Sequence, residues 1–205
     1  MVKRKRLKVW LLVLVIVIVV LIVLFAIGTF KKSDTGIWDY NGLKFHNETV
    51  GNSTFYVAGV DIYINGTPNS YGFYFRNYPS ELEEIPFNVV SRIRNKAYIA
   101  FSPETLECED TSLIAWNLGE FFGRMGSEAT GAITTPIKDG KLSIVVNCSV
   151  VVPGATILVV EAGSEANRVY THPENRECIV IETTDCEIIK GSERFILGML
   201  LSLLR

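Results

Sequence analysis

The first pattern along the chain is a long apolar run close to the N-terminus. Residues 9–28 include no charged side chain, and a helix of about 20 apolar residues matches the roughly 30 Å hydrocarbon core of a bilayer. A cleaved signal peptide is the rival interpretation, but its apolar region normally covers about 7 to 15 residues and ends in small residues. This run is longer and ends in the sequence FAIGTF at 25–30. We therefore predict one transmembrane helix over 9–28.

The charges on either side of this run set the orientation of the predicted helix. Five basic residues precede it: Lys3, Arg4, Lys5, Arg6 and Lys8. Only Lys31 and Lys32 follow it closely, and an excess of basic residues marks the cytoplasmic side of a membrane helix. We expect a signal-anchor in the cell membrane, with a cytoplasmic stub at 1–8, a linker at 29–36 and an extracytoplasmic domain at 37–205.

The first part of this domain has the pattern of an antiparallel meander. Aromatic and β-branched residues that alternate with polar ones fill 38–46, 54–64 and 71–75. Turn signals divide them at Asn41-Gly42, Gly51-Asn52 and Asn65-Gly66. Alternation bounded by such turns is typical of neighbouring antiparallel strands.

The second part combines strand and helix patterns. Apolar residues recur at helical spacing in 110–124 and in 185–204, which predicts two amphipathic helices. Short apolar runs predict further strands over 96–101, 131–137, 142–147, 156–161 and 178–182. This order of elements predicts an α+β domain in which the two amphipathic helices cover one face of a mixed β-sheet.

A second membrane span is the rival interpretation of the C-terminal helix. Lys190, Glu193 and Arg194 interrupt its apolar residues. Only about ten uninterrupted apolar residues remain, which is far short of a span. The protein is therefore expected to cross the membrane once.

The charge balance narrows the classes of partner. The chain has 20 Lys and Arg against 22 Asp and Glu, and five of the basic residues belong to the stub, so the outer domain carries a formal charge of about −7. Nucleic acid is bound mainly through Lys and Arg that neutralise phosphates, and this acidic domain is unsuited to it. The expected partners are the lipid bilayer and a protein of the cell envelope.

No sequence signature of catalysis or metal binding is present. The chain has no Gly-X-Ser-X-Gly, His-Glu-X-X-His, Walker or Cys-X-X-Cys motif. His46 and His172 are its only histidines, too few for a histidine-rich metal site. Acidic residues cluster at 81–84 and 107–110, but adjacent positions do not place two carboxylates across a cleft, as a glycosidase requires. The sequence favours a non-catalytic protein with no metal and no cofactor.

The chain contains four cysteines, Cys108, Cys148, Cys178 and Cys186. An even number in an outward-facing domain favours two disulfides. A reactive thiol at Cys108 is the alternative, because this residue precedes a predicted helix whose N-terminus would stabilise a thiolate. Its acidic neighbours at 107, 109 and 110 act in the opposite direction.

Four cysteines allow three pairings. Cys108 and Cys186 each follow a predicted strand and begin a predicted helix, so parallel strands would bring them to the same sheet edge. Cys148 ends one predicted strand and Cys178 begins another, as in antiparallel neighbours. We favour Cys108 with Cys186 and Cys148 with Cys178, and the other two patterns remain open.

Two kinds of candidate surface site remain. Asn-X-Ser/Thr sequons, the acceptors of N-glycans, occur at Asn47, Asn52, Asn65 and Asn147. Arg76 lies between Tyr74 and Tyr78, and exposed aromatic residues beside an arginine are typical of recognition patches. The alternative for this aromatic stretch is ordinary strand alternation between core and surface.

The strings YGFYFRNYPSELEEIPF at 71–87 and CIVIETTDCEIIKGSERFILGMLL at 178–201 resemble small single-pass envelope proteins of uncultured archaea. The resemblance implies one N-terminal anchor and an outer domain without an assigned activity. It carries no catalytic residue over to this chain.

Three hypotheses for function follow. The leading one is a membrane-anchored extracytoplasmic protein with a non-catalytic binding or structural role in the cell envelope. The alternative is an envelope enzyme or thiol-redox accessory that uses Cys108 or an acidic pair. A third, a subunit of a larger membrane complex, is not favoured because the apolar run lacks the small-X-X-X-small pattern of closely packed membrane helices.

Overall fold

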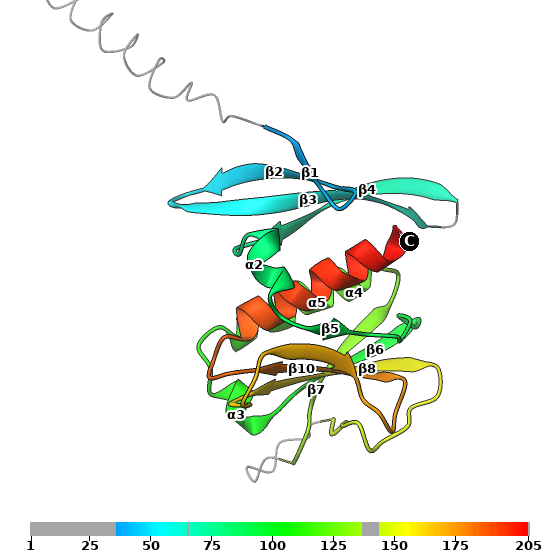
Figure 1. The fold of residues 1–205 in the computed structure, drawn as a ribbon. Coiled ribbons are helices and arrows are strands. Elements are labelled where there is room, and N and C mark those ends of the chain that lie inside the picture. The colour runs from blue at the N-terminus through cyan, green and yellow to red at the C-terminus, as the bar shows by residue number, and fades with distance from the viewer. Residues whose placement is uncertain (1–35, 65, 137–143, 205) are drawn as a thin grey trace, which may run out of the picture. The chain divides into compact units, whose positions relative to one another are not determined.

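The computed structural model describes residues 36–64, 66–136 and 144–204. The predicted stub, transmembrane helix 9–28 and almost all of the linker lie outside these residues. Within the described ranges, no helix is long and apolar enough to cross a membrane. The described domain has three layers: a four-stranded sheet, a layer of helices and a six-stranded sheet (Figure 1).

The four-stranded sheet is the predicted antiparallel meander. Its strands are β1 (Trp38–Tyr40), β2 (Leu43–Val50), β3 (Ser53–Ile64) and β4 (Thr67–Phe75), which pair in chain order. The turn between β1 and β2 is Asn41-Gly42, with φ of 53° and 90°. Positive φ at both central residues is the requirement of a tight hairpin turn, and Asn-Gly meets it best.

The six-stranded sheet is mixed, as predicted. Its strands are β5 (Phe87–Asn88), β6 (Lys96–Phe101), β7 (Glu128–Ile133), β8 (Ala155–Ala162), β9 (Arg168–Thr171) and β10 (Cys178–Thr183), in the order β5-β9-β10-β8-β6-β7. Strands β7, β6, β8 and β10 are parallel, and β9 is antiparallel to β10. All six residues of β10 are buried, which is typical of a parallel strand that is covered on both faces.

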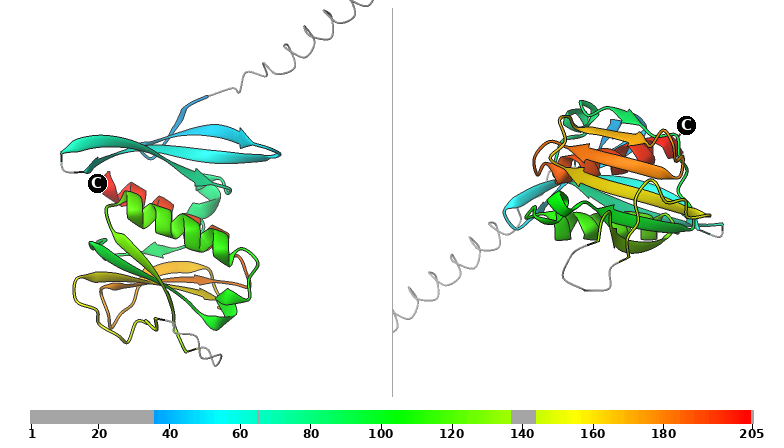
Figure 2. Two further views of the ribbon diagram at one scale, coloured as in Figure 1. Left: turned by 180° about the vertical axis from the view of Figure 1, so that it is seen from behind. Right: turned by 90° about the horizontal axis from the view of Figure 1, so that it is seen from below.

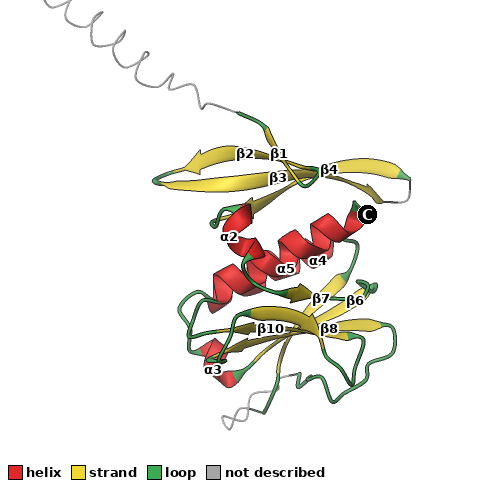
Figure 3. Ribbon diagram, in the orientation of Figure 1, coloured by secondary structure: helices red, strands yellow, loops and turns green. Residues whose placement is uncertain are grey.

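Three of the four described helices lie between the two sheets, and the short helix at 103–106 lies beside the six-stranded sheet, away from the four-stranded one (Figure 1). The four are α2 (Pro79–Glu83), α3 (Pro103–Leu106), α4 (Thr111–Arg124) and α5 (Ile188–Leu203). The two long ones, α4 and α5, cover one face of the six-stranded sheet, as predicted, and the four-stranded sheet covers their other side (Figures 2 and 3). The predicted single sheet is therefore two sheets, because the buried residues of α5 extend around most of the helix.

Helix α5 approaches the six-stranded sheet closely at a glycine. A Cβ atom at Gly191 would lie 2.5 Å from Thr183 Cγ2 and 2.9 Å from Ile181 Cγ2, both on β10. These distances are shorter than carbon atoms tolerate. Only glycine therefore lets this turn of α5 pack against the β-branched side chains of the strand.

A buried carboxylate joins α5 to the end of β4. Glu193 is 3% exposed and accepts hydrogen bonds from the backbone N–H groups of Arg76 (2.7 Å) and Asn77 (3.0 Å) and from Asn77 Nδ2 (2.9 Å). Burial raises the pKa of Glu193, and the three donors partly offset this rise. Of the two buried polar side chains of α5, Ser192 and Glu193, Glu193 thus satisfies two backbone N–H groups where β4 ends.

Two disulfides close the domain, with the pairing favoured from the sequence. Cys108 is bonded to Cys186 and Cys148 to Cys178, with Cα–Cα distances of 5.6 and 5.4 Å. The first joins the turn before α4 to the segment that leads into α5. In the chain-entropy description, cross-links over 78 and 30 residues contribute about 4.5 and 3.6 kcal/mol.

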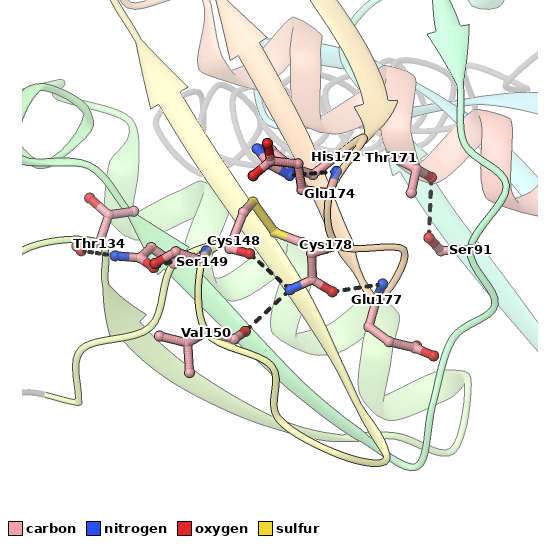
Figure 4. Close-up of a disulfide and its surroundings, with 12 residues drawn as sticks. Ser91, Thr134, Cys148, Ser149, Val150, Thr171, His172, Glu174, Glu177 and Cys178 are labelled. Carbon is pink, nitrogen blue, oxygen red and sulfur yellow. Dashed lines mark hydrogen bonds between the residues drawn. A yellow bond between two sulfur atoms is a disulfide. The ribbon is translucent and has the colours of Figure 1, made fainter.

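The second disulfide holds an irregular segment against the outer face of the six-stranded sheet (Figure 4). The buried Asn175 donates from Nδ2 to the carbonyl oxygens of Cys148 (2.9 Å) and Val150 (3.2 Å). Residues 142 and 143 of the strand predicted over 142–147 lie outside the described residues, and the described remainder forms a single bridge, between Val145 and Ile133. The disulfide and side-chain hydrogen bonds thus hold this segment, together with two backbone hydrogen bonds, from Ile133 N to Ile144 O and from Val146 N to Ile133 O, both 2.9 Å long.

We predict that Gly191→Ala lowers the free energy of unfolding by about 1–2 kcal/mol. Overpacking against the stiff β-branched residues of β10 costs about 1–3 kcal/mol, which exceeds the gain in helix propensity of about 0.5–1 kcal/mol. The matched control is Gly119→Ala in α4, where an added Cβ meets no atom within 4 Å. In urea unfolding, the free energy of unfolding should fall for Gly191→Ala and rise for Gly119→Ala. Equal stabilisation by the two substitutions would contradict the close packing of α5.

Candidate binding groove

An apolar groove runs beside α4, where the β2–β3 hairpin and the edge strand β4 face the helix. Its volume is about 320 Å³. The hairpin contributes Val50 and Phe55, β4 contributes Tyr74, and α4 contributes Trp116 and Asn117. The groove is thus formed by two layers of the domain that are far apart in sequence.

The side chains around the groove are unusually exposed for their type. Trp116 is 70% exposed, Val50 56% and Tyr74 46%. Trp116 lies two residues from both Ile114 and Leu118, which are fully buried. A step of two residues along a helix points to the opposite side, so α4 directs its core residues inward and its tryptophan outward. Clusters of exposed apolar side chains mark interaction sites more often than single ones do.

Tyr74 is held in one orientation. Its hydroxyl donates to Glu48 Oε2 at 3.1 Å, across the sheet from β4 to β2. Its ring meets that of Phe55 edge-on, with centroids 6.1 Å apart. The hydrogen bond to Glu48 raises the pKa of Tyr74, so the phenol stays protonated at neutral pH. A partner would meet a preorganised aromatic side chain.

Arg124 closes the other end of the groove. It forms an ion pair with Glu120 Oε1 at 2.6 Å and donates to the carbonyl oxygen of Gly72 on the free edge of β4. Its guanidinium lies over the rings of Tyr71 and Phe73, at 5.4 and 5.2 Å from their centroids. A cation that covers a free strand edge discourages further strand pairing. The groove is therefore suited to side-chain contacts rather than to the addition of a strand.

Of the three residues predicted to form a recognition patch, only Tyr74 lines this groove. The side chain of Arg76 lies 3.9 Å from Asp110, and both are about half exposed. The ring of Tyr78 stacks on Trp38 at 6.2 Å and meets Tyr56 edge-on at 5.2 Å. Sequence reasoning missed Trp116, although its position off the apolar stripe of α4 is a signal that could have identified it.

The predicted glycosylation sites differ in their surroundings. Asn47 and Asn52 are exposed, and Asn52 follows Val50 at the tip of the β2–β3 hairpin. Asn147 is partly buried, donates from Nδ2 to the carbonyl oxygen of Thr134 (3.3 Å), and accepts from Ser149 N (3.1 Å). Asn65 lies outside the described residues. A glycan at Asn52 would border the groove, whereas one at Asn147 would be attached to the nitrogen that donates to Thr134 O.

Residues for the alternative, catalytic hypothesis are arranged differently from the prediction. Cys108 is 5% exposed and bonded to Cys186, and all four cysteines are paired. The acidic residue with a notable environment is Glu161, in a cavity of about 280 Å³ at the carboxyl ends of β6, β7 and β8. Burial raises the pKa of Glu161, and the nearby carboxylates of Glu182 and Glu104 raise it further.

This carboxyl-end cavity lies where sheets of α/β proteins commonly bind ligands. Its lining also includes Glu104, Ser102, Thr134 and Ser164, but no histidine. Among the described residues, no group of three or more His, Cys, Asp or Glu side chains is placed to hold a metal ion. The cavity thus brings two carboxylates, Glu161 and Glu104, together with hydroxyl groups, and the pKa of Glu161 is raised.

Comparison with known proteins finds no match for this chain. No protein-family model matches the chain, and neither a curated protein nor a solved structure matches it.

We predict that Trp116→Ala leaves the free energy of unfolding within about 0.5 kcal/mol of the wild type, since the side chain is 70% exposed. Phe121→Ala, on the buried side of α4 at 1% exposure, should cost about 3–5 kcal/mol. Urea unfolding measures both. A loss above about 2 kcal/mol for Trp116→Ala would assign this tryptophan to the core instead of the groove.

Proposed function

We propose that this protein is a membrane-anchored component of the cell envelope whose outer domain binds a protein partner without catalysis. The observation that carries the proposal is the groove bordered by Trp116, Tyr74 and Val50. Tryptophan and tyrosine are the residues most enriched among those that dominate binding energy at interfaces. The packing of the domain core does not account for the exposure of Trp116 and Tyr74.

The charges near the groove favour one chemistry for the partner. Glu48 and Glu120 lie at its borders, and Arg124 is already paired with Glu120. The outer domain as a whole carries a formal charge of about −7. Complementary charge steers association and selects partners. We propose that the groove binds a segment that combines apolar or aromatic side chains with Lys or Arg.

The location rests on two independent supports. The uncharged run at 9–28 has the length and flanking charges of a signal-anchor. Two disulfides in one domain are typical of an oxidising compartment outside the cytoplasm. Both agree with a single-pass protein whose C-terminal domain faces outward.

Site-directed photo-crosslinking in the native membrane tests the proposal. A benzophenone side chain at Asn117, inside the groove, should give a discrete protein adduct with a partner segment rich in apolar and basic residues. The same probe at Glu174, an exposed residue of the β9–β10 loop, is the matched control and should not give this adduct. Adding Trp116→Ala to the Asn117 probe should reduce the yield at least tenfold, because a central aromatic contact is worth about 2 kcal/mol or more.

Two results would count against the binding role. One is an adduct that forms equally from both probe positions or that ignores Trp116→Ala. The other is a robust hydrolase turnover of the purified protein that a single substitution at Glu161 abolishes. The second result would favour the envelope enzyme, for which the carboxyl-end cavity is the specific structural support.

The thiol-redox alternative is tested by thiol titration of the native, air-exposed protein. We expect no free thiol, because each cysteine is bonded to another in the structure. Titration after unfolding in reductant should then give four thiols. Two or more reactive thiols before reduction would support the redox role at Cys108 and contradict a purely structural one.

A further inference from the structure

A second pocket lies on another side of the domain, between α5 and β5. Its volume is about 400 Å³. The apolar part of its lining includes Phe87 and Leu201, and the polar part includes Arg194, Asn88 and Glu83. None of these residues lines the apolar groove beside α4, so the two sites are separate.

The pocket contains two charged residues, Glu83 and a half-buried arginine, Arg194, and the two form no ion pair within 4.0 Å. Arg194 donates from Nε to the carbonyl oxygen of Ile85 at 2.8 Å, and its guanidinium lies over the ring of Phe87, 5.0 Å from the centroid. Four other arginines of the described domain form ion pairs with carboxylates within 4.0 Å, but Arg194 forms none with a described residue. Its Nη atoms donate no hydrogen bond within the described ranges.

The surroundings of Arg194 disfavour its charge. Burial lowers the pKa of Arg194, and the more distant Glu83 offsets part of this effect. The Glu83 carboxylate is engaged elsewhere, since its Oε1 accepts from Asn41 Nδ2 at 3.1 Å. A partly desolvated guanidinium with unused donors is costly for a fold. Such local costs are typical of positions retained for a ligand.

We infer that this pocket binds a small carboxylate ligand, with the carboxylate on the Nη atoms of Arg194 and an apolar group against Phe87 and Leu201. The planar guanidinium presents paired N–H donors that match the two oxygens of a carboxylate. Nε is already fixed by Ile85 and the plane is held over Phe87, so the remaining donors are preorganised. The apolar side of the pocket gives a short aliphatic chain a surface to cover.

Two sources present this chemistry: a free organic acid and the C-terminal carboxylate of a peptide. Three probes of the same size class distinguish them. 4-Methylvalerate has the carboxylate and the branched chain, N-acetyl-leucine adds the last peptide unit, and N-acetyl-leucinamide is the neutral control. Binding of both acids without the amide indicates carboxylate recognition in general. Binding of N-acetyl-leucine at least tenfold tighter than of 4-methylvalerate indicates a peptide C-terminus.

The test is calorimetric titration of the full-length chain in mild detergent with each probe. We expect at least one acid to bind with a dissociation constant below 10 mM and the amide at least tenfold more weakly, a difference of about 1.4 kcal/mol. Arg194→Gln should weaken the acid at least tenfold, and Arg194→Lys should weaken it partially because it keeps the charge but loses the paired donors. Arg92→Gln, at an exposed arginine outside the pocket, should change the constant less than twofold.

Thermal unfolding distinguishes a variant that has lost binding from one that fails to fold. The acid that binds should raise the Tm of the wild type and of Arg92→Gln, but not that of Arg194→Lys to the same extent. The inference is overturned if neither acid binds the wild type at 50 mM, if the amide binds equally well, or if Arg194→Gln folds and keeps full affinity.

Discussion

Helix α5 is apolar over most of its surface, and the chain must therefore cover it on more than one side. Ten of its residues are buried, from Ile188 to Leu200. A helix with a single apolar stripe needs one sheet, whereas one that is apolar around most of its circumference needs cover on both sides. The six-stranded sheet supplies one layer of that cover and the four-stranded meander supplies the other. The order of the layers follows from this one helix.

Three local devices keep α5 in place between the sheets. Gly191 permits the close contact with β10, Glu193 ties the helix to the backbone at the end of β4, and the Cys108–Cys186 disulfide ties its approach segment to the turn before α4. They act at different points around the first turns of the helix. The N-terminal half of α5 is consequently fixed to both sheets and to its neighbouring helix.

The two candidate sites follow from how this layered core ends at the surface. One side of helix α4 is buried, and the other is not covered by the four-stranded sheet. Trp116 therefore lies outside the core, next to Tyr74 of the edge strand β4. Beside the middle and the C-terminal half of α5, the short strand β5 covers the helix only partly, which leaves Arg194 facing a pocket. Both sites therefore arise at incomplete edges of the same packing, while the centre of the domain is closed.

The elements that sequence reasoning placed well are those with strong local signals. The meander, with its Asn41-Gly42 turn, and the helices α4 and α5 follow from periodicity and turn chemistry. The strand β9 was missed because its four residues, Arg168–Thr171, are too few to show a period. In the described part of the strand expected over 142–147, the structure has one bridge and no full strand, because an apolar run indicates burial but not how much backbone pairing accompanies it.

The candidate sites were less predictable than the fold. Tyr74 was identified from its place in an aromatic stretch, but its partner Trp116 lies 42 positions later in the chain, and only packing brings the two together. The lack of an acid beside Arg194 is likewise a property of three-dimensional surroundings. By itself, the sequence determined the apolar segment, the acidic character of the chain that follows it, the even number of cysteines and the local elements, because these depend on composition or on neighbouring residues. The tertiary structure alone decided the division into two sheets, the groove and the unpaired arginine, because each depends on contacts between residues distant in the chain.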